Sequence, residues 1–275
     1  MNIAITGASG FIGRHLLKSL AQAGHSPRAL SRHAPLVESD VVIHLAGEPV
    51  AQRWTSAARQ RILESRVAGT RNLVQALARL PRKPEALICA SAIGYYGSRG
   101  DEILTESSAP GSGFLPEVCV AWEREAQAAE AFGIRVVRVR TGIVLDAHGG
   151  ALARMLPPFR MGAGGRLGSG RQWMSWIHLE DLVGLFQFAV ESQVRGPLNA
   201  VAPNPVTNSD FTRELARALR RPALFPVPEF ALRLLFGEMA AVLLASQRIA
   251  PGAAGAAGFP FRFPQLAPAL ESLFL

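Results

Sequence analysis

The chain has 275 residues, of which 49% are apolar and 18% are charged, a composition typical of one large globular domain or two joined ones. Two cysteines, Cys89 and Cys119, are too few for a disulfide framework or a multi-cysteine zinc site, and no metal site is expected. The formal net charge is +8, and lysine occurs only at Lys18 and Lys83, so arginine supplies almost all the positive charge. Because these cations are scattered along the sequence, nucleic-acid binding is not expected.

We expect no targeting segment at the beginning of the chain, because Met1-Asn2 leads directly into the strand-like residues 3–5. The longest apolar stretch, residues 230–245, contains charged residues and is too short to span a bilayer, which needs about 20 helical residues. We therefore expect a cytoplasmic protein with no membrane partner.

Apolar segments and amphipathic helical segments alternate through the first half of the chain. The expected elements are strands at 2–6, 28–31, 41–45, 86–90 and 135–140, and helices at 11–23, 55–80 and 114–132. Apolar strands separated by helices predict an α/β fold with a doubly wound parallel sheet covered on both faces. The connection 31–40 is too short for a crossover helix, so we expect it to be irregular.

After about residue 145 the sequence becomes rich in glycine and then in proline. We interpret residues 1–148 as the sheet domain and residues 149–275 as a smaller C-terminal substrate domain that closes over the carboxyl edge of the sheet. The strand-like segment 198–201 is expected to return to the large sheet, so that residues 176–202 rejoin the first domain.

Three glycines at three-residue spacing, Gly7, Gly10 and Gly13, lie between the first strand and the first helix. The first permits a tight turn, the second lets the backbone approach a pyrophosphate, and the third lets the helix pack against the strand. The helix start supplies amide donors and a positive dipole. This combination predicts a Rossmann-like dinucleotide site, since a merely structural turn would not need small residues at all three places.

The end of the second strand indicates which dinucleotide binds. A carboxylate about 20 residues after the turn would hold the ribose 2′-hydroxyl of NAD, but the sequence there is Leu30-Ser31-Arg32-His33. Arg32 can pair with a 2′-phosphate, and Ser31 can donate a hydrogen bond to it. These residues favour NADP(H) over NAD. The alternative for Arg32 is a solvated surface residue.

Ordered motifs extend over essentially the whole chain. They are TGASGFIG (6–13), HLAGEPV (44–50), ESRVAGTRNLV (64–74), ASAIGYYG (90–97), CVAWE (119–123), RTGIVL (140–145), GSGRQWMSWIHLEDL (168–182) and NAVAPNPVTN (199–208). In this order the motifs resemble extended short-chain dehydrogenase/reductases, and more narrowly the NAD(P)-dependent epimerase-like YfcH family of "epimerase family proteins".

The resemblance implies a particular set of cofactor contacts. They would come from Gly7, Ser9, Gly10, Phe11, Ile12, Gly13, Ser31, Arg32, Leu45, Ala46, Gly47, Glu48, Arg61, Arg66 and Val144. The turn would line the pyrophosphate, the loop after the third strand would pass the adenine and ribose, and Val144 would touch the nicotinamide end. For Arg61 and Arg66 the alternative is a solvated helix face.

The usual catalytic residues of the superfamily are absent or rebuilt. Its classical members use Ser or Thr together with a YxxxK pattern, whose tyrosine exchanges a proton with the substrate. In this chain Cys119 stands at the tyrosine position, Glu123 at the lysine position and Ala92 at the Ser/Thr position. Glu123 is a candidate acid or base if it is buried with a raised pKa. Cys119 is a candidate proton donor, with packing as the alternative.

Tyr95 and Tyr96 are the only tyrosines, and they follow the fourth strand at the carboxyl edge, where substrates bind in open parallel sheets. Each is a candidate proton donor, with packing under the second domain as the alternative. In the second domain Arg171, Gln172 and Trp176 are candidate substrate contacts, because arginine can bind an anionic group and tryptophan can stack on a ring.

The sequence supports two hypotheses about function. The first is an NADP(H)-dependent oxidoreductase or epimerase-like enzyme with a non-standard triad, acting on a small hydroxyl- or carbonyl-bearing substrate such as a nucleotide sugar. The second is a catalytically silent NADPH-binding sensor. The altered CVAWE motif favours the sensor, whereas the polar loop of the second domain favours the enzyme. The resemblance leaves a homodimer open, since relatives often dimerise through the helix at this position.

Overall fold

The computed structural model describes residues 1–31 and 38–274. In this described part, six parallel strands form one central sheet in the order β10-β6-β4-β3-β1-β2. Their bounds are Asn2–Thr6 (β1), Ser26–Leu30 (β2), Val41–His44 (β3), Ala86–Ala92 (β4), Arg135–Thr141 (β6) and Gly196–Ala200 (β10). The predicted Rossmann-like α/β fold is confirmed.

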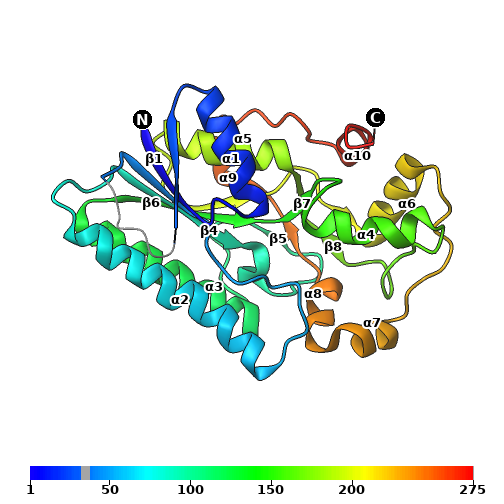
Figure 1. Cartoon of the computed structure of the whole chain (residues 1–275). Helices are drawn as coiled ribbons and strands as arrows, with labels where there is room; N and C mark the ends of the chain where they lie inside the picture. Colours follow the sequence, from blue (N-terminus) through cyan, green and yellow to red (C-terminus); the bar gives the residue numbers. More distant parts are fainter. Residues whose placement is uncertain (32–37, 275) are drawn as a thin grey trace.

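Helices cover both faces of the sheet (Figure 1). One face carries α1 (Phe11–Gln22), α5 (Leu179–Glu191) and α9 (Gly252–Ala256), and the other carries α2 (Ser56–Arg79) and α3 (Phe114–Gln127). This arrangement follows from the strands, which are apolar on both faces and therefore need a helical layer on each side.

Alternate residues of β1 show how the two cores are divided. Ile3 and Ile5 point into the core beneath α1 and α5, whereas Ala4 points into the core beneath α2 and α3. Successive side chains of a strand face opposite sides, so one short apolar segment stabilises both layers. Burying a side chain the size of isoleucine contributes about 1.5–3 kcal/mol.

The ends of the long helix α2 are set by a capping residue at its start and a proline after its end. The Thr55 side chain accepts a hydrogen bond of 3.2 Å from the Ala58 amide, and Pro81 follows the last residues of the helix. The expected helix 114–132 is shorter than predicted, because α3 gives way to a 3₁₀ turn, Ala128–Phe132.

The chain returns to the sheet twice after residue 149. β10 pairs with β6, which confirms the strand expected at 198–201. Residues 252–261 also pack against the core beneath α1, with Ala254 fully buried there and Phe259 and Phe261 at its margin. The expected boundaries put this later segment in the smaller domain, so its packing departs from them.

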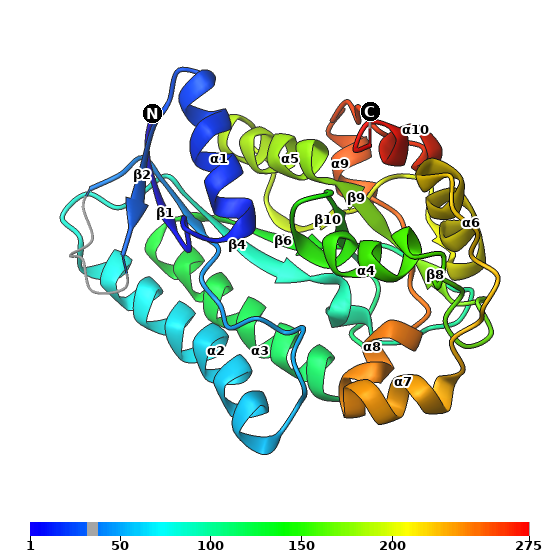
Figure 2. The ribbon, with the colours of Figure 1, turned by 45° about the vertical axis from the view of Figure 1, so that its right-hand side comes forward.

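A second core lies beyond the carboxyl edge of the sheet, as Figure 2 shows. It is built mainly from α4 (Gly150–Arg160), α6 (Asn208–Leu219) and α10 (Leu266–Glu271), and β7 (Ile143–Leu145) pairs with β9 (Trp176–His178) beside it. The remaining elements are short: β5 (Ile103–Leu104), β8 (Trp173–Met174), β11 (Val206–Thr207), α7 (Glu229–Phe236), α8 (Ala240–Leu244) and β12 (Arg248–Ile249).

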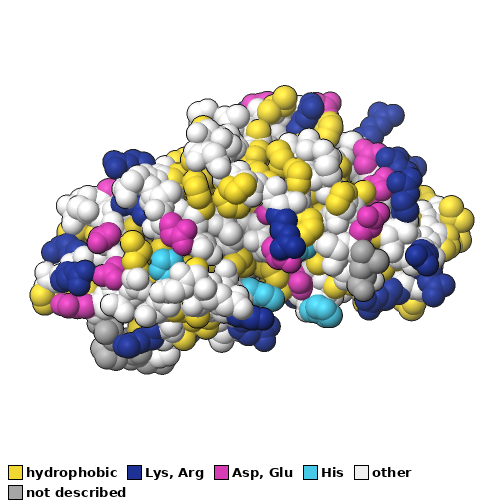
Figure 3. Space-filling view, turned by 90° about the horizontal axis from the view of Figure 1, so that it is seen from above, with side chains coloured by type: hydrophobic (Ala, Val, Ile, Leu, Met, Phe, Trp, Pro, Cys, Tyr) yellow, Lys and Arg dark blue, Asp and Glu magenta, His cyan; other side chains and the backbone are white. Residues whose placement is uncertain are grey.

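The connection expected to be irregular, 31–40, lies mostly outside the described residues, as does the predicted NADP contact Arg32. No helix in the described ranges is long and apolar enough to cross a membrane. On the face shown in Figure 3, Lys and Arg side chains lie in separate small groups with acidic side chains among them. This distribution agrees with the scattered positive charge of the sequence.

Candidate functional site

The glycine-rich turn joins β1 to α1 and admits no side chain at two of its positions. Gly7 has φ +70°, and a Cβ there would lie 2.8 Å from the Ala46 amide nitrogen. A Cβ on Gly13 would lie 2.5 Å from the Gly7 carbonyl oxygen. These contacts are closer than a Cβ tolerates, so the turn is built for close approach between β1, α1 and the loop after β3.

The start of α1 is open to an anionic ligand. Gly10 is the N-cap and provides no side-chain hydrogen bond, and the first turn carries no acidic side chain. The amides of that turn therefore remain available, and the helix dipole favours negative charge beside them. Ser9 is exposed next to this position. The turn thus fits the pyrophosphate of a dinucleotide, which is the role expected of it.

Phe11 connects the turn to the smaller part of the molecule. A Cβ at position 149 would overlap its ring, so the Gly149-Gly150 loop at the start of α4 closes directly onto Phe11. Val144 packs against the same core as Phe11 and Ile12. The structure therefore brings the predicted nicotinamide contact Val144 to the side of the glycine-rich turn.

The loop after β3 is held by α2. The Arg66 Nη1 atom donates a hydrogen bond of 2.9 Å to the Glu48 carbonyl, and the Glu48 amide donates one of 3.0 Å to Ser65 Oγ. The Arg61 guanidinium lies 3.6 Å from the Glu48 carboxylate. Arg61 and Arg66 thus position the loop Leu45–Glu48, and direct contact between either arginine and a cofactor stays a prediction.

Arg66 is the more enclosed of the two arginines. Its guanidinium lies 5.0 Å from the centre of the Trp122 ring, and a Cβ on Gly47 would lie 3.3 Å from it. Burial lowers the pKa of Arg66. The Arg66 guanidinium donates to backbone carbonyls and forms no ion pair with a described carboxylate. The nearby Glu48 carboxylate interacts with Arg66 electrostatically but does not pair with it, so this partly buried guanidinium can bind an anionic ligand.

Glu123 and Arg140 form a buried ion pair. Two hydrogen bonds of 2.8 Å join Arg140 Nε and Nη2 to the two carboxylate oxygens, and Ser91 Oγ donates a third bond of 2.7 Å to Glu123 Oε1. Glu123 is 4% exposed and Arg140 is 2% exposed. Although burial lowers the pKa of Arg140, its bonds to Glu123 raise it well above the usual range. Proton exchange between Glu123 and a substrate stays a prediction, and these contacts weigh against it.

The two tyrosines occupy a 3₁₀ turn, Ile93–Tyr96, but differ in environment. Tyr96 is fully buried; its hydroxyl donates to Asn199 Oδ1 at 2.6 Å and accepts from Arg140 Nη1 at 2.8 Å. Burial raises the pKa of Tyr96. The enclosed hydroxyl with both partners in place weighs against contact with a substrate, and a proton-donor role for Tyr96 stays a prediction.

Tyr95 is the tyrosine that remains accessible. Its ring centre lies 3.5 Å from the Arg140 guanidinium carbon, and its side chain is only partly buried. The Tyr95 hydroxyl makes no hydrogen bond to any described residue. Cation–π contact and packing against Tyr96 thus fix the ring, while the hydroxyl stays free.

Cys119 is a buried thiol beneath the end of β4. Its Sγ lies 3.8 Å from the Ala92 carbonyl oxygen, and it is 3% exposed. Burial raises the pKa of Cys119 to about 12. A thiol that stays protonated and enclosed fits the packing alternative, and a chemical role for it stays a prediction.

The expected substrate contacts in the second domain differ in exposure, and their roles stay predictions. Trp176 is fully buried in the second core, and its Nε1 donates to the Asn204 carbonyl at 3.1 Å. Gln172 is also buried and donates to the Leu167 carbonyl at 3.0 Å. Trp176 lies in β9, which pairs with β7, whereas Gln172 comes before β8 and is held by its bond to the Leu167 carbonyl. Arg171 is exposed, and its role stays a prediction.

The sequence analysis missed three residues that organise the site: Arg140, Asn199 and Glu106. Glu106 Oε1 accepts hydrogen bonds of 3.0 and 3.1 Å from the amides of Asn199 and Ala253. The available signal was Arg140 itself, one of three arginines in β6, because a charged side chain buried in a central strand needs a polar partner.

The fold and the turn together define a dinucleotide-binding α/β protein with a second, smaller core. The chain belongs to the NAD dependent epimerase/dehydratase family, whose model matches residues 3–201. A second model, described as a domain of unknown function, matches residues 227–273.

Two of the following relatives match along nearly their whole length, and the third along part of its length. "Epimerase family protein YfhF" of Bacillus subtilis is 40% identical, over 99% of this chain and 98% of its own. The crystal structure of human epimerase family protein SDR39U1 with NADPH has a TM-score of 0.93 and 32% identity, covering 99% of both chains. A Corynebacterium glutamicum nucleoside-diphosphate sugar epimerase is 36% identical with a TM-score of 0.81, covering all of this chain and 58% of that one.

The comparisons confirm the resemblance to epimerase family proteins that the motifs indicate. NADPH in the human structure agrees with the predicted preference for NADP(H).

Proposed function

We propose that this protein binds NADP(H) along the glycine-rich turn and uses it to oxidise, reduce or epimerise a small hydroxyl- or carbonyl-bearing molecule. The observation that carries the proposal is a juxtaposition at one edge of the sheet. Gly7 directly follows β1 and Tyr95 lies in the turn directly after β4, so both lie at carboxyl ends of parallel strands. Ligands bind at this edge in open α/β sheets.

The residues of the chain divide the work as follows. The nicotinamide supplies hydride chemistry when it is bound. The amides at the start of α1 bind the pyrophosphate, and Phe11 and Val144 wall the adjoining space. Tyr95 exchanges a proton at its hydroxyl oxygen, and Arg140 acts as a positioning residue that holds the ring through the contact at 3.5 Å.

A nucleotide sugar is the substrate class that we favour. The Corynebacterium relative is described as a nucleoside-diphosphate sugar epimerase, and its matching part is 36% identical. Arg171 is the exposed cation that we propose as a phosphate contact for such a substrate. Cytoplasmic location and a homodimer are further predictions of the same proposal.

The second candidate function is NADPH binding without turnover. This candidate is favoured by the environments of Cys119 and Glu123, which stand at the positions of the superfamily's tyrosine and lysine. Cys119 is buried and protonated, and Glu123 is occupied by Arg140 and Ser91. Neither can replace a lysine-activated tyrosine.

Purified protein distinguishes the two candidates. NADPH oxidation and epimerisation are measured with a panel of small carbonyl compounds and nucleoside-diphosphate sugars, and NADPH affinity is measured by calorimetry. We expect turnover that Tyr95→Phe lowers by about 10²–10⁴-fold, the usual contribution of a general acid–base group, with NADPH affinity unchanged. Full turnover in Tyr95→Phe would exclude this tyrosine. Tight NADPH binding without turnover on any member of the panel would favour the second candidate.

A further inference from the structure

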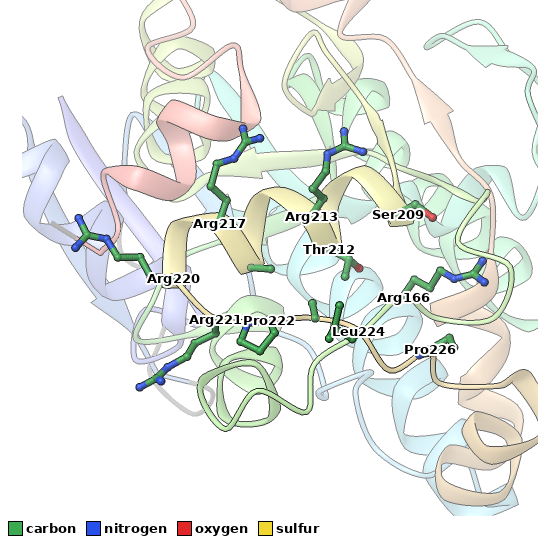
Figure 4. A pocket seen from close by; sticks show the side chains of 12 residues that line it. Arg166, Ser209, Thr212, Arg213, Arg217, Arg220, Arg221, Pro222, Leu224 and Pro226 are labelled. Atoms are coloured by element: carbon green, nitrogen blue, oxygen red, sulfur yellow. The ribbon is translucent and has the colours of Figure 1, made fainter.

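A groove of ≈ 500 Å³ lies on the smaller part of the molecule, between α6 and the segment that follows it. Figure 4 shows the groove along the whole length of the helix, with the segment 222–226 as its second wall. It is built on α6 and not at the carboxyl edge that holds the glycine-rich turn, so the cofactor site does not account for it.

The middle of the groove is mostly apolar. Ala216 and Thr212 face it from α6, and Pro222 and Leu224 face it from the opposite wall. Leu224 is 76% exposed, and the next residue, Phe225, is 67% exposed. Exposed large apolar side chains bordered by polar groups are typical of interaction surfaces.

Arginines stand at both ends of the groove. Arg166 lies beside Ser209 at the start of α6, and Arg220 and Arg221 lie at its end (Figure 4). Within the described residues none of these three arginines forms an ion pair with a carboxylate. Arg166 donates only to the Ser169 carbonyl, at 2.6 Å.

The arginines along the helix are, in contrast, already paired. Arg213 lies 2.7 Å from Asp210, and Arg217 lies 3.1 Å from Glu214. Uncompensated positive charge is therefore concentrated at the two ends, with the apolar surface between them. A ligand that matches this arrangement carries anionic groups at both ends and apolar groups in the middle.

We propose that this groove binds an acidic peptide segment of another protein, with carboxylates at its two ends and apolar side chains between them. Helix α6 has 12 residues and a length of about 18 Å, which an extended peptide of about five or six residues spans. Each terminal carboxylate pairs with a guanidinium, and the central side chains cover Leu224.

Two other occupants fit less well. A nucleotide carries its phosphates at one end and would leave the opposite arginines without partners. A second copy of this chain would bring the same arginine-bordered surface against its own, and like charges across an interface repel.

The test uses the full chain and a fluorescein-labelled peptide with two glutamates at each end and Leu-Phe-Leu in the middle, measured by fluorescence anisotropy at about 150 mM salt. We expect saturable binding that Arg166→Gln together with Arg221→Gln weakens at least about tenfold. Leu224→Ser should also weaken it. The matched control, Arg79→Gln together with Arg124→Gln, removes the same charge from exposed positions on α2 and α3 and should change affinity less than about twofold.

Four results would overturn the proposal. Equal weakening in the control variant, or equal binding of a peptide with serines in the middle, would show unspecific attraction of acidic chains. No binding of the peptide, together with Leu224-dependent binding to phosphatidylserine vesicles, would show a lipid surface as the occupant. No binding to either probe would leave the groove without a partner of this chemistry. NADPH affinity, measured on the same variants, should remain that of the unmodified chain.

Discussion

Arg140 donates two hydrogen bonds of 2.8 Å to Glu123, and through this pair strand β6 is tied to helix α3 beneath the carboxyl edge of the sheet. The same guanidinium also reaches the Tyr96 hydroxyl and stacks on the Tyr95 ring. One buried cation therefore organises both tyrosines, and the site depends on its remaining charged and in place.

Removing one partner of this pair should destabilise the protein strongly. Arg140→Gln removes both charged hydrogen bonds to the buried Glu123 carboxylate and leaves Arg138, 3.7 Å away, as its remaining cation. Glu123→Gln leaves the Arg140 guanidinium without a carboxylate partner among the described residues. Such changes typically cost about 3–5 kcal/mol. The double variant should lose less than the sum of the two. Urea unfolding of all four proteins measures the coupling, and strictly additive losses would contradict the buried pair.

The two tyrosines should respond differently to replacement by phenylalanine. Tyr96→Phe leaves Asn199 Oδ1 and an Arg140 donor unsatisfied in the core, so the free energy of unfolding should fall by about 1–3 kcal/mol. Tyr95→Phe removes a hydroxyl without a described partner and should change stability by less than about 0.5 kcal/mol. Thermal or urea unfolding checks both values, and equal losses would show that the two hydroxyls share one environment.

Gly13→Ala should disturb the glycine-rich turn. The added methyl group would lie 2.5 Å from the Gly7 carbonyl and 2.7 Å from the Ala8 Cα, so both stability and NADPH affinity should fall. Gly69→Ala in α2 is the matched control, because nothing lies within 4 Å of its Cβ position. The control should gain up to about 1 kcal/mol from helix propensity. An unaltered NADPH affinity in Gly13→Ala would contradict the close packing of the turn.

His44 should make the fold sensitive to acid. It is 3% exposed, its ring nitrogens contact Thr6 and Thr70 at 2.6 and 3.1 Å, and burial lowers its pKa from 6.5 to about 4. The unfolded chain binds this proton below pH 6.5, whereas the folded chain does not until about pH 4. The stabilisation that comes from burying neutral His44 is therefore fully present above pH 6.5. It is lost as the pH falls from 6.5 to about 4, and the free energy of unfolding decreases by about 3 kcal/mol in total.

Urea unfolding between pH 7 and pH 4 measures this dependence. His44→Gln should flatten the curve over that interval, since glutamine keeps a polar group but does not titrate. His148→Gln, at an exposed position, is the control. An identical slope in His44→Gln and the unmodified chain would mean that another group controls the acid response.

The parts of the fold that were predicted correctly are those fixed by local sequence. The turn between β1 and α1 follows from glycine spacing beside an apolar run, and the limits of α2 follow from Thr55 and Pro81. These signals act within a few residues, so they do not depend on how distant parts of the chain pack.

The parts that were not predicted depend on contacts between distant segments. Glu123 and Arg140 meet only because α3 packs on β6, and Trp176 is buried only because α4, α6 and α10 assemble around it. Tyr95 and Tyr96 are adjacent in sequence, yet the 3₁₀ turn directs one inward and leaves the other partly exposed. The sequence identifies both tyrosines as candidates, and only the tertiary structure shows that their exposure differs.

The central claim is that the turn from Gly7 to Gly13 binds NADP(H), and titration calorimetry with NADPH and NADH tests it most directly. We expect one NADPH per chain, bound more tightly than NADH, and a loss of this preference in Arg32→Ala. Absence of measurable heat with both reduced and oxidised forms of either coenzyme, from protein shown to be folded, would contradict the account.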